Sequence, residues 1–255
     1  MPGISHLVLV LSVVLTLPLP LYAKLAGTFE PPEANCCLAA HARSLADQLE
    51  DWNQLGRYHK ENLQLRSNPE DPNRIVFFGD SITDWWNLAQ FFPGKPYVNR
   101  GISGQTTPQM LARFYQDVIR LHPAAVVILA GTNDIARNTG PQTAKMIQDN
   151  FRAMAALAKS RDIKVILCSV TPISDYLAPD RSVRRPPSDI LLLNDWLKDN
   201  ALQIDAFYVD YFSAMNDSSG FLKKELSEDG LHPNEKGYVI MAPIVEAAID
   251  RILKQ

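Results

Sequence analysis

The sequence predicts a single α/β domain in which a parallel sheet lies between two layers of helices. Short runs of β-branched and aromatic residues, apolar at every position, recur along the chain and alternate with helical segments. Continuous rather than alternating hydrophobicity is typical of strands that are covered on both faces, as in parallel sheets. The alternation of such strands with helices is typical of α/β folds. Hydrophobic residues make up 46% and charged residues 21% of the chain, which is the composition of a globular protein.

Five segments fit a buried strand: 74–78, 97–99, 124–130, 163–170 and 206–210, of which the second is the weakest. Apolar residues at helical spacing predict an N-terminal amphipathic helix over 38–55 and further helices over 108–119, 147–158 and 244–252. Pro108 suits the first turn of its helix. We therefore expect one α/β/α sandwich with about five parallel strands.

The chain before the first strand has a different character. An apolar run covers 7–21 and ends near Ala23, and it is shorter than the roughly 20 apolar residues of a membrane-spanning helix. Its length is typical of an export signal, although no Lys or Arg precedes it. We predict a signal peptide over 1–23, either cleaved or retained as an anchor. A linker with the amphipathic helix over 24–73 and a core over 74–255 follow it. The protein is then exported, to the periplasm or the extracellular space.

Composition excludes several classes of function. The 25 Lys and Arg against 28 Asp and Glu give a net charge of −3 with no basic block, so we expect no nucleic-acid partner. The three cysteines are too few for a disulfide framework, and no Cys/His cluster has the spacing of a metal site. We expect neither a metal nor a cofactor.

Polar residues follow the predicted strands at several places. Sites in parallel sheets form at the carboxyl ends of the strands, so these segments can converge. They are 79–83 (GDSIT), 101–106 (GISGQT), 131–134 (GTND) and 229–233 (DGLHP). Each alone is an ordinary loop sequence, but together they offer a nucleophile, a base and hydrogen-bond donors.

His232 is the candidate base. Of the five histidines, it alone has a carboxylate three residues earlier, Asp229. At that spacing a turn can hold one ring nitrogen and leave the other free to take a proton. Ser81 follows a predicted buried strand and is the candidate nucleophile. A serine hydroxyl is a poor nucleophile at neutral pH without a neighbouring base, and His232 can supply that base. In the structural alternative, Asp229 and Asn234 cap the final helix and Ser81 is an N-cap.

Acyl transfer also needs donors for the oxyanion that develops on the carbonyl oxygen. The backbone amide of Ser81 and the side-chain amide of Asn133 are candidates. Glycine lets a backbone amide approach a ligand without a Cβ in the way, so either Gly104 or Gly101 can supply a third donor.

These four segments resemble the blocks of the GDSL, or SGNH, hydrolases, in the same order and over most of the chain from Arg74 to Ile252. Ile82 replaces the eponymous leucine. The resemblance implies a flavodoxin-like three-layer fold, a triad and an oxyanion hole, and no metal or cofactor. Within it, Ser81, His232 and Asp229 match the triad, and Ser81, Gly104 and Asn133 match the oxyanion hole.

The same resemblance implies hydrolysis of carboxylic esters through an acyl-enzyme. Short acyl groups, and O-acetyl groups on carbohydrates above all, are the favoured substrates of such an exported enzyme. A lysophospholipase or thioesterase with the same triad is an alternative within enzymes. A catalytically idle binding protein with the SGNH fold is an alternative outside them.

Two groups of residues have two possible roles each. Trp85 and Trp86 follow the nucleophile closely, and either stack on a sugar ring or pack in the core and rim. The loop 171–187 carries Arg181, Arg184 and Arg185, which either meet an anionic substrate or form a solvated surface.

Overall fold

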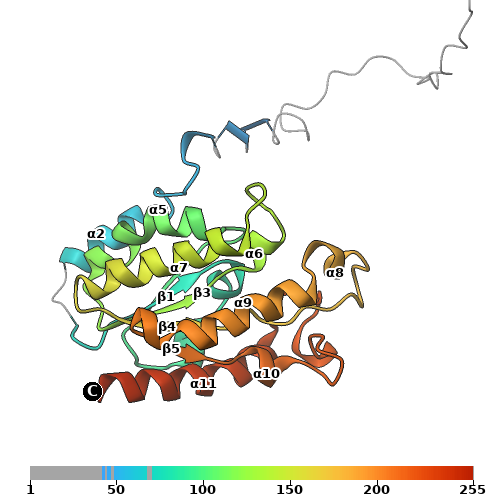
Figure 1. Ribbon diagram of the computed structural model, residues 1–255. Coiled ribbons are helices and arrows are strands. Elements are labelled where there is room, and N and C mark those ends of the chain that lie inside the picture. Colours follow the sequence, from blue (N-terminus) through green and yellow to red (C-terminus); the bar gives the residue numbers. More distant parts are fainter. Residues whose placement is uncertain (1–41, 44, 47–48, 68–70, 255) are drawn as a thin grey trace, which may run out of the picture. The chain divides into compact units, whose positions relative to one another are not determined.

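The computed structural model describes residues 42, 43, 45, 46, 49–67 and 71–254 (Figure 1). The predicted signal peptide over 1–23 and much of the segment before residue 49 lie outside the described residues. The chain divides into two compact units, Met1–Arg43 and Ser44–Gln255. The fold below is that of the second unit.

The described part of the chain contains one five-stranded sheet. Its strands are β1 (Ile75–Gly79), β2 (Tyr97–Gly101), β3 (Ala125–Leu129), β4 (Lys164–Cys168) and β5 (Ala206–Val209). They lie in the order β2-β1-β3-β4-β5, and every neighbouring pair is parallel. The prediction of a parallel sheet is confirmed, with all five segments in place.

Each strand is buried because helices cover both faces of the sheet. Val76 and Phe78 of β1 belong to one core cluster, with apolar residues of α5 (Thr107–Asp117), α7 (Ala144–Lys159) and α9 (Pro187–Asn200). Ile75 and Phe77 of the same strand belong to a second cluster, with residues of α4 (Leu88–Phe91) and α11 (Glu235–Leu253). Figure 1 shows α7 and α9 on one side of the sheet and α11 on the other. Successive side chains of a strand point to opposite faces, so two cores require the continuous hydrophobicity of the sequence.

The helices and turns connect these strands in chain order. They are α2 (His59–Ser67), α3 (Ser81–Asp84), α4 (Leu88–Phe91), α5 (Thr107–Asp117), η1 (Ile119–Leu121), α6 (Thr132–Ile135), α7 (Ala144–Lys159), α8 (Arg181–Arg184), α9 (Pro187–Asn200), η2 (Leu202–Ile204), α10 (Phe212–Met215), η3 (Lys224–Leu226) and α11 (Glu235–Leu253). The predicted helices over 108–119, 147–158 and 244–252 fall within α5 with η1, α7 and α11. None of the helices in the described residues is both long and apolar enough to cross a membrane.

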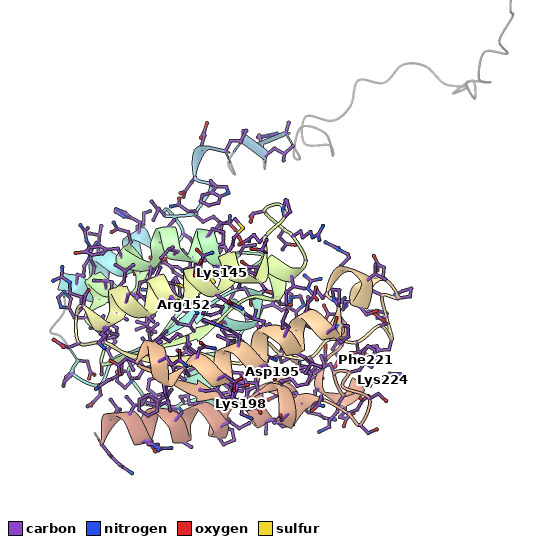
Figure 2. The ribbon with its side chains drawn as sticks, in the orientation of Figure 1. Lys145, Arg152, Asp195, Lys198, Phe221 and Lys224 are labelled. Atoms are coloured by element: carbon purple, nitrogen blue, oxygen red, sulfur yellow. The ribbon has the colours of Figure 1, made fainter. Side chains whose placement is uncertain are left out.

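The amphipathic pattern of α7 matches its position. Phe151 and Met154 are buried in the core, and the outer face carries Lys145 and Arg152 (Figure 2). Both cations pair with Asp149, at 2.6 Å and 3.1 Å. Such exposed pairs stabilise a helix by only about 0.3–0.5 kcal/mol each, so burial of the apolar face holds α7 in place.

The N-terminal amphipathic helix ends earlier than predicted. Its described residues are helical up to Glu50, and 51–53 form a turn. The Asp51 carboxylate accepts hydrogen bonds from the amides of Leu55 and Gly56, both at 2.8 Å. An Asp side chain that bonds nearby amides favours a turn over a continued helix, which hydrophobic spacing alone does not reveal.

A buried arginine joins the carboxyl ends of β1 and β2. Arg113 of α5 is fully buried and donates to the carbonyl oxygens of Gly79 at 3.0 Å and Arg100 at 2.9 Å. It also donates to the Gln105 side chain at 2.6 Å and to the Asp117 carboxylate at 2.9 Å. Burial lowers the pKa of Arg113, and the charge of Asp117 opposes that shift. The guanidinium is therefore paired with a carboxylate and donates to four acceptors, which offset the cost of burying its charge.

Removing this arginine should destabilise the fold more than removing a surface charge. Arg113→Met leaves the buried Asp117 carboxylate without its counter-ion, and we expect a loss of about 3–5 kcal/mol in the free energy of unfolding. Urea denaturation measures it. The control Lys145→Met should cost less than about 1 kcal/mol, and Arg113→Met/Asp117→Leu should recover part of the loss. A cost for Arg113→Met as small as that of the control would contradict this role.

Candidate active site

Ser81 lies directly beyond the end of β1. It is the first residue of α3 and is buried. Asp80, not Ser81, is the N-cap of that helix, and its carboxylate accepts a hydrogen bond from the Ile82 amide at 3.0 Å. The hydroxyl of Ser81 is therefore not occupied in capping, which removes the structural alternative for this serine.

His232 lies between Ser81 and Asp229. Its Nε2 is 2.9 Å from Ser81 Oγ, although the two residues are 151 positions apart in the sequence. Its Nδ1 is 2.7 Å from Asp229 Oδ2. In this arrangement the carboxylate fixes the ring, and Nε2 can take the serine proton.

The loop before α11 holds the Asp229 carboxylate. Its Oδ1 accepts hydrogen bonds from the backbone amides of Leu231 at 2.9 Å and His232 at 2.8 Å. Partial burial alone would raise the pKa of Asp229, but the amide and ring of His232 outweigh it and lower the pKa to about 2. The carboxylate is thus ionised at neutral pH. The cap of α11 is Asn234, which accepts from the Gly237 amide at 3.1 Å, so Asp229 is not a helix cap.

The structure separates the two candidate glycines. The amide of Gly101 donates to Asn99 Oδ1 at 2.8 Å, and a Cβ on Gly101 would lie 2.1 Å from the Asp84 nitrogen, so this glycine serves close packing. Gly104 is exposed with φ +80°, and open space surrounds the place of its missing Cβ. Within the described residues its amide donates no hydrogen bond, which leaves it available to a ligand.

Asn133 belongs to α6, at the carboxyl end of β3. Its Nδ2 donates to the carbonyl oxygen of Gln105 at 3.1 Å and approaches Asp80 Oδ2 at 3.4 Å. Its Oδ1 accepts from Asn138 at 3.0 Å and from Arg185 at 3.3 Å. Two donors on the oxygen fix which way the amide faces. The N–H nearest Asp80 makes only this long contact, so it is the less strongly bound of the two N–H groups.

Two carboxyl groups are buried beneath this site. Burial raises the pKa of Asp80 to about 7, against the hydrogen bond from the Ile82 amide. Burial also raises the pKa of Asp134 to about 6, although its carboxylate accepts from both the hydroxyl and the amide of Thr107. Asp80 therefore binds the first turn of α3, and Asp134 binds the first turn of α5. No group of three or more His, Cys, Asp or Glu among the described residues could hold a metal ion.

Arg185 was predicted only as one of three loop arginines that either meet an anionic substrate or form a solvated surface, and the solvated alternative is wrong for this residue. It is buried, and its guanidinium donates to Thr132 Oγ1 at 3.2 Å as well as to Asn133 Oδ1. The neighbouring Arg184 is exposed. Nothing in the local sequence distinguishes the two, because the tertiary fold alone decides which arginine points inward. Arg181 reaches Asp229 at 3.9 Å.

The two tryptophans after the nucleophile lie in different surroundings. Trp86 is 2% exposed and stacks on Tyr238 in the core, with ring centroids 5.1 Å apart. It packs rather than meeting a ligand. Trp85 is 57% exposed, and the centroid of its ring lies 4.1 Å from the centroid of the His232 ring. Of the pair, only Trp85 reaches the surface beside the site.

Several known proteins are similar to this chain in sequence and fold. The sequence pattern of the GDSL-like lipase/acylhydrolase family matches residues 77–240. A solved structure from Bacteroides fragilis is similar at 40% identity with a TM-score of 0.74, covering 80% of this chain and 99% of that chain.

Two acetylxylan esterases are more distant relatives. That of Xylanibacter ruminicola is 27% identical over 76% of this chain and 48% of its own length, so this chain spans about half of that relative. That of Geobacillus stearothermophilus is 25% identical over 66% of this chain and 90% of its own length. The family pattern covers more than half of the present chain, including the carboxyl end of every strand. The chain therefore belongs to the GDSL-like lipase/acylhydrolase family.

Proposed function

We propose that the protein is a carboxylic ester hydrolase in which Ser81 is the nucleophile, His232 the general base and Asp229 the group that orients it. The observation that carries this proposal is the continuous contact from Ser81 Oγ through the His232 ring to Asp229. A base within about 3.2 Å of a serine hydroxyl, itself held by a carboxylate, is the arrangement that nucleophilic acyl transfer needs.

The reaction then follows in two halves. Ser81 Oγ attacks the ester carbonyl while His232 takes its proton, and the negative charge passes to the carbonyl oxygen. The amides of Ser81 and Gly104 and the side chain of Asn133 stabilise that oxyanion. His232 returns the proton to the leaving alkoxide. Water next attacks the acyl-enzyme, His232 takes the water proton, and Ser81 regains a proton as the acid leaves.

The substrate class we propose is a short-chain ester, above all an O-acetyl group on a carbohydrate. Two observations support it. The relatives from Xylanibacter ruminicola and Geobacillus stearothermophilus are acetylxylan esterases. A polar cavity, described below, also adjoins Gly104. Export remains a prediction, because the segment 1–23 lies outside the described residues.

An acyl-chain series tests the substrate. We expect kcat/KM to be highest on p-nitrophenyl acetate and to fall about tenfold or more by the octanoate, because a pocket shaped for a short acyl group loses binding with added methylenes. Initial rates at equal ionic strength measure it. A maximum at long chains would favour a lysophospholipase, and turnover of acyl thioesters alone would favour a thioesterase.

Substitutions in the triad test the assigned roles. Asp229→Asn should lower kcat by roughly 10⁴-fold with KM little changed, because an amide holds the imidazole in the wrong tautomer. Ser81→Ala should lose a similar factor or more. Stopped-flow and steady-state assays on p-nitrophenyl acetate measure both, with circular dichroism to confirm folding. Full activity in folded Ser81→Ala would refute the nucleophile.

The contact between Arg185 and Asn133 makes a separate prediction. Arg185→Met frees the Asn133 amide to turn, and a displaced donor can cost up to about 100-fold in kcat. KM for p-nitrophenyl acetate should change little, because the lost hydrogen bond stabilises the oxyanion of the transition state and not the bound ester. The exposed neighbour gives the control Arg184→Met, which should retain activity on this small ester. Equal losses in both variants would show that Arg185 acts only through general charge.

A further inference from the structure

A polar cavity opens beside the candidate oxyanion hole. Its volume is about 580 Å³, and its lining includes Trp52, Gln54, Ser103, Gly104, Asn138 and Arg184. Ligand pockets for small molecules have volumes of about 300–1,000 Å³. Amide, hydroxyl and guanidinium groups border the space, so it suits a ligand with many hydroxyl groups better than an acyl chain.

Trp52 is the aromatic residue of this lining. Its side chain is 47% exposed, yet its backbone is held firmly. Gln109 donates to the Trp52 carbonyl oxygen at 2.7 Å, and Gln105 donates to that of Asn53 at 3.1 Å. Both glutamines are buried. A large aromatic side chain on an anchored backbone gives contact area at a low cost in conformational entropy.

Gln105 follows Gly104 in the same loop, and Gln109 lies in the first turn of α5, which begins after that loop. Gln109 caps α5 through its oxygen, which accepts from the Thr106 amide at 3.2 Å, and the carbonyl oxygen of Gln105 accepts from Asn133. Trp52 and its neighbour Asn53 are thus each linked by one hydrogen bond to residues beside the site. It also lies outside residues 77–240, which match the family pattern. The segment before the core therefore adds a wall that the family pattern does not contain.

We propose that this cavity is a saccharide subsite, in which the Trp52 ring stacks on a sugar unit of the alcohol part of the ester. This proposal rests on the proposed function, because the cavity adjoins Gly104 and its occupant is joined to the carbonyl at Ser81. The apolar C–H face of a sugar ring meets the indole, and the sugar hydroxyls meet the polar rim of Gln54, Asn138 and Arg184.

The exposure of Trp52 has one competing explanation. Trp52 continues an apolar stripe with Leu45 and Leu49, which are 60% and 85% exposed. If Trp52 acts only as part of this apolar stripe, then Leu49→Ala should change the kinetics on the acetylated saccharide as Trp52→Ala does. Leu49 does not line the cavity, so it provides a matched control.

The test compares two substrates that share the acetyl group. On ethyl acetate, whose alcohol part has no ring to meet the indole, Trp52→Ala should keep kcat/KM within about twofold of the wild type. On chemically acetylated xylotetraose its KM should rise about 3- to 10-fold with kcat unchanged, as expected for the loss of one stacking contact. Trp52→Phe should restore most of the affinity, and Leu49→Ala should match the wild type on both substrates. Equal losses on both substrates, or no loss on the saccharide, would overturn the proposal.

A binding measurement separates failure of this proposal from failure of the proposed function. Isothermal titration calorimetry with unacetylated xylotetraose uses Ser81→Ala, with and without Trp52→Ala. Binding that is lost with Trp52→Ala supports the subsite even if the wild type hydrolyses no acetylated sugar. Absence of binding to Ser81→Ala overturns the subsite even if the wild type proves to be an active short-chain esterase.

Discussion

A charge buried beneath the carboxyl edge of the sheet sets the geometry of the site. The Arg113 guanidinium bonds the carbonyl oxygen of Gly79, two residues before Ser81, and that of Arg100 at the end of β2. A buried cation needs a counter-ion and a full set of acceptors, and Asp117 and Gln105 supply them. Because one rigid group joins both strand ends, the loops that follow them start from fixed positions. The precision of the contact between Ser81 and His232 depends on that constraint.

The strands were predictable because their hydrophobicity is continuous, and the two core clusters explain why it must be. The site was predictable because each of its segments follows a strand or precedes the last helix. The helix α9 and the turn at Asp51 were not found. A helix at the end of a proline-rich loop gives a weak signal, and hydrophobic spacing does not register a carboxylate that bonds nearby amides.

Other choices depend on tertiary contacts that no local pattern encodes. The residues alone leave both Gly101 and Gly104 as candidates, and the family resemblance favours Gly104. In the structure, the hydrogen bond of the Gly101 amide and the proximity of Asp84 to Gly101 separate the two. Trp85 and Trp86 are adjacent, yet one is exposed and the other stacks on Tyr238. Arg184 and Arg185 differ in the same way. In each pair the sequence supplies the residue types, and packing decides which member faces the site.

The indole of Trp85 has a further consequence for the histidine that it covers. Its ring is tilted by 35° relative to that of His232, so the two faces meet over much of their area. In the proposed reaction the imidazole becomes a cation when it accepts the serine proton. A cation on an aromatic face is attracted by the ring quadrupole, by about 0.5–1 kcal/mol at exposed sites. This cation–π attraction is present only while the His232 ring carries the additional proton. An aromatic cover of this kind therefore favours the protonated imidazole over the neutral one.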